Sequence, residues 1–112
     1  MSNRNTSFHI QLLAETIDIQ KFPMTKLIID LHVTEEEYEA LFHMLQHLEK
    51  QYKIQKEEGF VEFTSLLVHF AGMLTQKLPP NQTIYALKKE GYYPSLMNEF
   101  IQLIEQDKDR NR

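Results

Sequence analysis

The sequence predicts an all-α protein, a small multihelical bundle that is built on a long helical hairpin and that forms oligomers. Two observations predict this fold. Apolar residues recur with gaps of three and four along residues 34–58 and again along 60–78, which places them on one face of each of two helices. Gly59 lies between the two stretches and suits a helix end. We expect one domain over residues 1–112, with frayed tails at 1–5 and 107–112.

The first helix is expected to begin at Thr6 or Ser7, whose hydroxyl groups suit a helix N-cap. The apolar residues that follow have a mixed spacing, which fits a helix as far as about Gln20. Pro23 has no backbone N–H to donate, so we expect it to interrupt this helix and to occupy the first position of the next one.

The segment Met24–Val33 is ambiguous in the sequence. Apolar residues at alternate positions from Leu27 onward are typical of a strand. A solitary strand leaves its backbone groups unpaired, and the sequence contains no second convincing strand. The segment is therefore either a short helix or a strand that pairs with the same segment of another subunit. We prefer the helix, with Leu27, Ile28 and Leu31 on one face.

The helix over residues 34–58 has a recognisable start. Thr34 and Glu37 have the spacing of a capping box, in which the side chain of each residue bonds to the backbone N–H of the other. Its period is close to 3.5 residues, which is typical of a helix that packs along one seam. The expected seam consists of Tyr38, Leu41, Leu45, Leu48 and Tyr52.

The helix over residues 60–78 has a broader apolar face, which indicates burial on more than one side. Gly72 lowers helix stability at this position, so we expect another helix to approach closely there. We expect Pro79 and Pro80 to end the helix. Its apolar face consists of Phe60, Phe63, Leu66, Leu67, Phe70, Met73 and Leu74.

Two further helices complete the chain. The first is expected to start at Asn81 or Thr83 and to stop at Gly91. Pro94 suits the first position of the last helix. The buried stripe of that helix is expected to consist of Leu96, Phe100, Leu103 and Ile104.

Composition excludes several classes of function. The formal net charge is −4, so no overall positive field attracts nucleic acid or an anionic membrane. The chain contains no cysteine, which excludes disulfides, thiolate catalysis and cysteine-based zinc sites. No apolar stretch reaches the roughly 20 residues of a membrane-spanning helix, and residues 1–7 do not have the apolar character of a signal peptide. We therefore expect a cytoplasmic protein that does not associate with membranes.

The best pattern for a metal site consists of Glu39, His43 and His47, which recur every four residues on one helix. Their heptad positions lie away from the apolar seam, so ordinary histidines on a wet surface are the simpler interpretation. These three residues are weak metal-ligand candidates, and we expect no metal, no other cofactor and no catalytic residues. His69 lies within an apolar stretch and is expected to be a core or interface residue.

The region around Gly91 suggests a helix-turn-helix, because Lys88 and Lys89 precede a glycine and a further helix. A recognition helix needs cations near the phosphates of DNA. The last helix has no lysine or arginine before Lys108 and carries glutamates instead. Nucleic-acid binding is therefore disfavoured, and a helical corner is the preferred interpretation.

Two stretches resemble the YhaI family of small Bacillus proteins, namely IDLHVTEEEYEALFHMLQHLEK over residues 29–50 and KEGYYPSLMNEF over residues 89–100. The likeness extends over nearly the full chain and rests on overall similarity, since neither stretch is a mechanistic motif. That family is regarded as all-helical and of unknown function. The resemblance therefore supports a helix at Met24–Val33 and implies no activity.

The patterns favour a non-enzymatic, self-associating helical interaction or regulatory protein, a homo-oligomer that can also bind an unidentified protein partner. Its stripes offer more apolar surface than a small monomer easily hides, although they can also close on one another within one chain. The alternative is a regulatory domain that binds a small molecule among Phe63, Phe70, Tyr92 and Phe100. The expected interface residues are Leu27, Ile29, Leu31, Phe63, Leu67, Phe70, Gly72 and Leu74.

Overall fold

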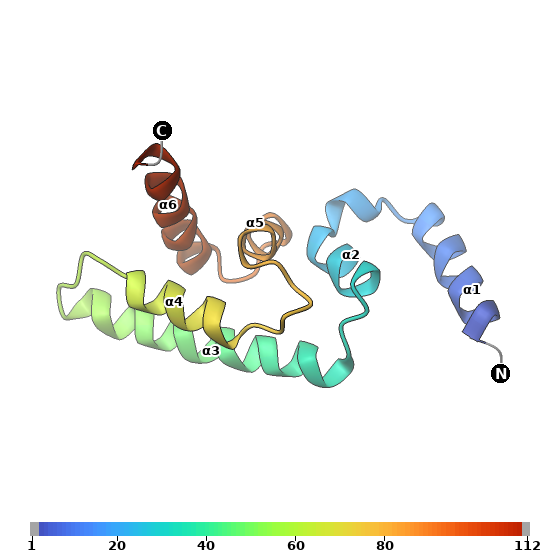
Figure 1. Cartoon of the computed structure of the whole chain (residues 1–112), viewed down its shortest axis with the longest axis horizontal. Helices are drawn as coiled ribbons and strands as arrows, with labels where there is room; N and C mark the ends of the chain where they lie inside the picture. Colours follow the sequence, from blue (N-terminus) through green and yellow to red (C-terminus); the bar gives the residue numbers. More distant parts are fainter. Residues whose placement is uncertain (1–2, 111–112) are drawn as a thin grey trace.

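The structure is a computed structural model that describes residues 3–110. These residues form six α-helices and one short 3-10 helix, with no strand among them (Figure 1). The all-α prediction is therefore confirmed. In chain order the elements are α1 (Asn3–Thr16), η1 (Ile19–Lys21), α2 (Pro23–Asp30), α3 (Glu35–Glu57), α4 (Thr64–Met73), α5 (Pro80–Glu90) and α6 (Pro94–Arg110).

The longest helix, α3, is paired with α4, and the two form the predicted hairpin (Figure 1). α5 packs against both α6 and α2, and α6 also reaches α4. α1 lies at one end of the molecule, beyond α2 and away from the hairpin (Figure 1). The chain measures 54 × 32 × 23 Å and is therefore elongated. Within residues 3–110, every helix is too short or too polar for a bilayer crossing.

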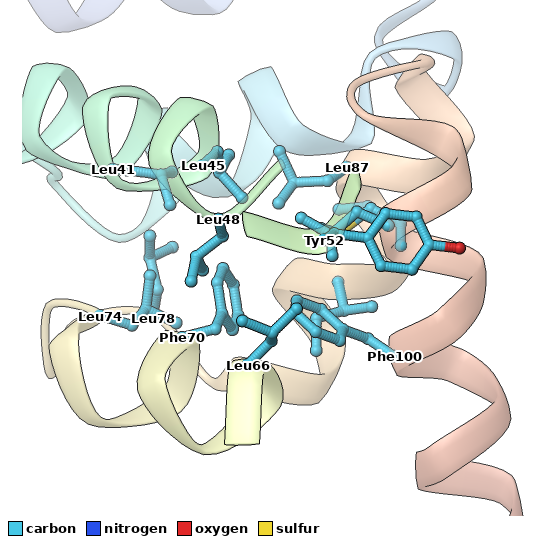
Figure 2. Close-up of a cluster of buried hydrophobic side chains, with 14 of the residues drawn as sticks. Leu41, Leu45, Leu48, Tyr52, Leu66, Phe70, Leu74, Leu78, Leu87 and Phe100 are labelled. Atoms are coloured by element: carbon cyan, nitrogen blue, oxygen red, sulfur yellow. The ribbon is translucent and has the colours of Figure 1, made fainter. Parts of the chain in front are cut away.

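The hydrophobic core lies among α3, α4, α5 and α6, and Figure 2 shows part of it. Leu45 and Leu48 of α3 are almost completely buried, as the seam predicts. The ring of Phe70 in α4 packs against that of Phe100 in α6, with 5.6 Å between their centroids. Met24 joins α2 to this core with only 1% of its surface exposed. No described residue of α1 belongs to the core.

The predicted boundaries of α3 are confirmed. The hydroxyl of Thr34 accepts a hydrogen bond from the Glu37 backbone N–H at 3.1 Å, and the Glu37 carboxylate accepts one from the Thr34 N–H at 2.9 Å. This is the complete capping box. Gly59 follows the helix with a φ of +91°, a left-handed conformation that glycine adopts at little cost. Gly91 has the same φ and ends α5.

The prediction of one helix over residues 60–78 is wrong at both ends. The loop residue Phe63 buries its ring against Tyr52, with 4.9 Å between the centroids. The Glu62 carboxylate then accepts hydrogen bonds from the backbone N–H and the hydroxyl of Thr64, where α4 begins. At the other end the backbone becomes extended at Leu74. The start of α4 thus depends on the tertiary contact of Phe63 with Tyr52 and on the Glu62–Thr64 hydrogen bonds, which the spacing of apolar residues does not report.

The two prolines after this segment have a different role from the expected one. Pro80 is the first residue of α5, whereas α4 has already ended at Met73. α5 thus begins at Pro80 rather than at Asn81 or Thr83. A proline suits this position because the first N–H groups of a helix have no intrahelical partner. Thr83 lies inside α5, where its hydroxyl donates a hydrogen bond to the Pro79 carbonyl at 2.7 Å.

The preferred helix at Met24–Val33 is confirmed over Pro23–Asp30, with Pro23 at its start, and the strand alternative is wrong. The boundaries of α1 differ from the prediction, since it begins at Asn3 rather than at Thr6 or Ser7. The helix ends at Thr16, whose hydroxyl donates to the Leu13 carbonyl at 2.8 Å, and the chain turns into η1 before Gln20.

The expected frayed tails are helical wherever the structure describes them. α1 already includes residues 3–5, and α6 continues through residues 107–110. Side chains at 107–110 are exposed, which agrees with a charged and solvated end of the chain. The rest of the predicted tails, residues 1, 2, 111 and 112, lies outside the described residues.

Candidate functional site

Apolar side chains are exposed along α1 and at Ile17, which directly follows the helix. Leu13 is 60% exposed, Phe8 54% and Ile17 50%. Helical spacing places Ile10, Leu13 and Ile17 on one face, whereas Phe8 and Leu12 are one turn apart on another face. α1 therefore presents apolar side chains on two sides. This distribution is typical of a helix that is buried on more than one side.

The face of α1 that contains Leu13, together with Ile17 just after the helix, lines an open groove of about 330 Å³. The opposite wall comes from η1 and α2. The lining is apolar apart from Thr25 and the ion pair between Lys26 and Asp30. The complete set of lining residues is Ile10, Leu13, Ala14, Ile17, Ile19, Thr25, Lys26, Ile29 and Asp30.

α2 forms the anchored wall of this groove. Buried Met24 holds one side of the helix in the core. The hydroxyl of Thr25 donates to the Glu90 carboxylate at 2.8 Å, which ties α2 to the end of α5. Ile29, in contrast, is 44% exposed and lines the groove. One side of α2 is therefore buried in the core, and another side exposes an apolar residue to the groove.

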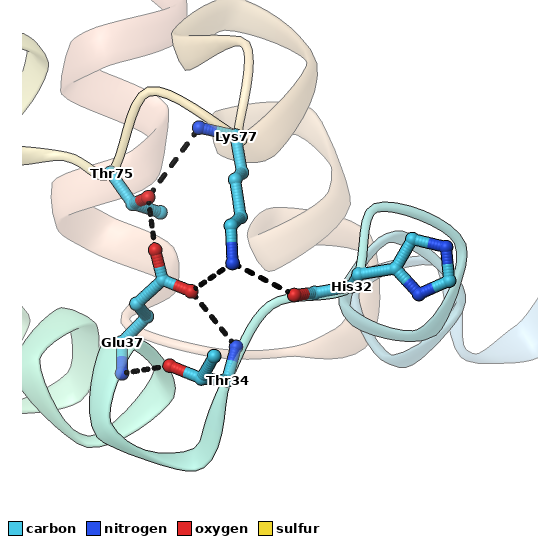
Figure 3. Close-up of polar contacts among 5 residues, drawn as sticks. All are labelled: His32, Thr34, Glu37, Thr75 and Lys77. Carbon is cyan, nitrogen blue, oxygen red and sulfur yellow. Dashed lines mark hydrogen bonds and ion pairs between the residues drawn. The ribbon is translucent and has the colours of Figure 1, made fainter. Parts of the chain in front are cut away.

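A polar cluster holds the other end of α2 against the hairpin (Figure 3). The ammonium group of Lys77 donates to the Glu37 carboxylate at 2.6 Å and to the His32 carbonyl at 3.0 Å, and the Thr75 hydroxyl donates to Glu37 at 2.7 Å. The bond from Lys77, followed by those from the Thr34 backbone and from Thr75, lowers the pKa of Glu37 from 4.5 to about 2. The loop after α4 is thereby joined to the connection between α2 and α3.

The predicted interface residues of α2 lie near the groove, but only one of them faces it. Ile29 lines the groove, whereas Leu27 and Leu31 are partly buried against the core. The preferred helix already placed Leu27 and Leu31 on a common face without Ile29, whereas the strand alternative placed all three on one side. The helix in the structure turns Ile29 away from the core-facing pair.

The predicted interface residues of α4 are mostly covered by the chain itself. Phe63, Phe70 and Leu74 belong to the core, with exposed fractions of 3%, 0% and 8%, so they are closed to a partner. Leu67 is partly buried. No helix of the described chain approaches Gly72 closely, because a Cβ atom there would meet no atom within 4 Å, and an approach by another copy stays a prediction.

A second apolar surface lies on the open side of α4 and in the loop before it. Met73 is 68% exposed, Val68 64% and Val61 92%. Ala71 and Gly72 continue this surface with exposed small residues. These residues are on the hairpin and so are separate from the α1–α2 groove, which is built from other elements.

The interface residues predicted from the sequence include none from α1, although the spacing of its apolar residues indicates two apolar faces. Residues 10, 13, 14 and 17 follow the spacing of one helix face, and residues 8 and 12 follow that of a second face. The first set alone describes an ordinary amphipathic helix. The apolar residues 8 and 12 distinguish α1 from such a helix, because a helix that is buried on one face carries polar residues on the opposite face.

The histidine pattern lies on the surface. Glu39, His43 and His47 are exposed along α3. The His47 ring lies 6.3 Å from the ring of His69 in α4, measured between centroids. His69 is exposed and so does not belong to the core, which leaves the interface as the remaining part of the prediction. In the range 3–110, no group of three or more histidine or carboxylate side chains is arranged to hold a metal ion.

The residues expected to surround a ligand do not meet around a cavity. Phe63 packs on Tyr52, Phe70 packs on Phe100, and the Tyr92 ring packs against Phe42 at 4.9 Å. Phe70 and Phe100 are fully buried. These aromatic rings fill the core, which counts against the small-molecule alternative.

Comparison with known families gives a match over almost the whole chain. A family model described as "Protein of unknown function (DUF1878)" matches residues 3–105. The matched range includes α1 together with α2, α3, α4 and α5 and most of α6. The exposed helix is thus part of the family's range, and the family description assigns it no activity.

Proposed function

The chain belongs to the DUF1878 family of unknown function, and we propose that it is a non-enzymatic, self-associating helical protein whose copies meet at the α1–α2 surface. The observation that carries this proposal is the area that a single chain leaves open. The accessible surface is 8158 Å², whereas a compact domain of 13.4 kDa exposes about 6,500 Å². The excess of about 1,700 Å² is larger than the roughly 800 Å² that each partner buries in a stable interface.

The shape of the chain supports the same proposal. Its radius of gyration is 16.3 Å, whereas a compact domain of this length has a radius of about 13 Å. α1 extends the molecule beyond α2 (Figure 1). It has exposed apolar side chains on two faces. Burial of apolar surface is the main driving force for association. Contact with a second copy would remove the exposed apolar surface of α1 from water.

The other functions have less support from the geometry. The aromatic side chains of the ligand-binding alternative fill the core. For DNA binding, Lys88 already donates to the Asn98 side chain at 2.7 Å and so ties α5 to α6. The exposed side of α6 carries Asn98, Gln102 and Glu105, which supply no positive charge to a phosphate.

Light scattering on a size-exclusion column across a range of protein concentrations tests the proposal. We expect a stable multiple of 13.4 kDa. Leu13→Glu places a charge in the groove and should shift the protein to the monomer, whereas Val68→Glu, on the open side of α4, should leave the mass unchanged. Circular dichroism confirms that both variants stay helical. A wild-type protein of 13.4 kDa at every concentration would overturn the proposal.

Two narrower statements stay predictions. The chain belongs to an uncharacterised family, whereas its relation to the YhaI proteins of Bacillus stays a prediction. A cytoplasmic location is consistent with the absence of a bilayer-crossing helix within residues 3–110. Binding of a second, different protein also stays a prediction.

A further inference from the structure

We infer that the Phe8–Leu12 face of α1 enters the α1–α2 groove of a second copy of this chain, and that the contact is reciprocal. The inference rests on the proposed self-association and names the inserting residues and the receiving groove. Each copy then contributes one inserting face and one groove, so the two halves of the contact are related by a twofold axis.

The geometry of α1 supports insertion into another copy. Phe8 and Leu12 are 54% and 44% exposed and do not line the groove of their own chain. The α-helix turns 100° per residue, so their side of α1 lies roughly opposite the side that carries Leu13 and Ile17. The chain's own groove is therefore beyond the reach of Phe8 and Leu12. A second copy offers them an apolar cavity of the same composition.

The receiving groove has the chemistry that this face requires. Its volume of about 330 Å³ is lined mainly by aliphatic side chains, among them Ile17 and Ile29. Both the inserting face and the groove lose apolar area from water in the complex, which favours association. The area that the chain exposes beyond that of a compact domain, about 1,700 Å², is sufficient for a contact of about 800 Å² per copy.

The charged groups of the groove bear on the orientation of a second copy. Lys26 and Asp30 both line the groove and form an ion pair with each other. Glu15 follows Leu12 by three residues and so flanks the inserting face. In the complex Glu15 of one copy would share the Lys26 of the other with Asp30, and charges at the edge of an interface set orientation more than affinity. The apolar face therefore supplies the driving force.

Disulfide trapping tests the contact directly. The chain has no cysteine, so single-cysteine variants report on chosen pairs. Leu12→Cys protein is mixed with size-tagged Ile29→Cys protein and oxidised; since each chain carries one thiol, the mixed disulfide joins two copies. The bond requires Cβ atoms about 4 Å apart. We expect this product to form about tenfold faster than the product of Leu12→Cys with Val68→Cys, which is the matched control on α4.

Light scattering on Leu12→Glu separates failure of this inference from failure of the proposed function. Leu12 is exposed, so the charge leaves the core intact, and we expect a monomer with the helical content of the wild-type chain. A wild-type protein that is monomeric throughout would defeat the proposed function itself. An oligomer that persists in Leu12→Glu, with a Leu12–Ile29 disulfide no faster than the control, would overturn the inference alone. An oligomer that dissociates only in Val68→Glu would also overturn it and move the interface to α4.

Discussion

The ammonium group of Lys77 lies 2.6 Å from the carboxylate of Glu37, although the two residues are 40 positions apart in the sequence. Glu37 is also the third residue of α3 and completes its capping box with Thr34. One carboxylate therefore holds the start of the long helix and the loop that follows α4. The pair places the hairpin and the end of α2 in fixed relation, because Lys77 also donates to the His32 carbonyl.

Stability should depend on pH through Glu37. Its pKa is lowered in the folded chain from 4.5 to about 2, mainly by Lys77. A lowered pKa means that the ionised group stabilises the fold above pH 4.5 and that this contribution is lost as the pH falls from 4.5 to about 2. Urea unfolding across this window should show a shallower pH dependence for Glu37→Gln than for the wild type.

Glu37→Gln keeps one side-chain acceptor for the capping box, removes the charge and replaces the second acceptor oxygen, which Thr75 uses, by an amide donor. Lys77→Gln should reduce the same pH dependence, since Lys77 is the largest cause of the lowered pKa. Wild-type and Glu37→Gln curves that stay parallel from pH 4.5 to 2 would contradict this account of the cluster.

Leu45→Ala should lower the free energy of unfolding by about 2–5 kcal/mol, because it removes a side chain with 0% exposure from the core. The matched control is Leu13→Ala on α1, where the leucine is 60% exposed. Measured at the lowest workable protein concentration, the control should change the free energy by less than about 1 kcal/mol. Equal losses for the two variants would mean that α1 is part of the core.

The two glycines of the hairpin should respond to alanine in opposite directions. Gly72→Ala should stabilise the chain by about 0.5–1 kcal/mol, because Gly72 is inside α4 and its Cβ would meet open space. Gly59→Ala should destabilise it by about 1–2 kcal/mol, because φ at Gly59 is +91°. Thermal unfolding of both variants measures the difference. Loss of association in Gly72→Ala, with stability unchanged, would indicate a partner helix on α4.

Removal of the cap hydroxyl in Thr34→Ala should lower the free energy of unfolding by about 0.5–2 kcal/mol. The hydroxyl accepts the Glu37 backbone N–H at the start of α3. Thr34→Ser retains an acceptor at the same position and should recover most of the loss. Chemical denaturation of the three proteins under one condition gives the comparison. A Thr34→Ser variant as unstable as Thr34→Ala would assign the effect to the lost methyl group.

Much of the fold could be predicted because it depends on neighbouring residues. The all-α class and the buried seam of α3 from Leu41 to Tyr52 follow from spacing, although Tyr38 of the predicted seam is 39% exposed. The start of α2 follows from the chemistry of Pro23, and its helical form was preferred because a solitary strand leaves its backbone groups unpaired. The ends of α4 did not follow, since Phe63 is held by Tyr52 from another helix. The candidate site was predicted in part, through Ile29, while α1 was overlooked because its two apolar faces read as one irregular helix.

The sequence by itself determined the local features of this protein. The capping box at Thr34 and the turn at Gly59 depend on groups within a few residues of one another, so the same atoms act in any all-helical arrangement. Only the tertiary structure decided which apolar faces are covered. Phe70 became core and α1 stayed open because burial depends on which distant helices pack together. The Glu37–Lys77 pair has the same origin, since folding alone brings residues 40 positions apart into contact.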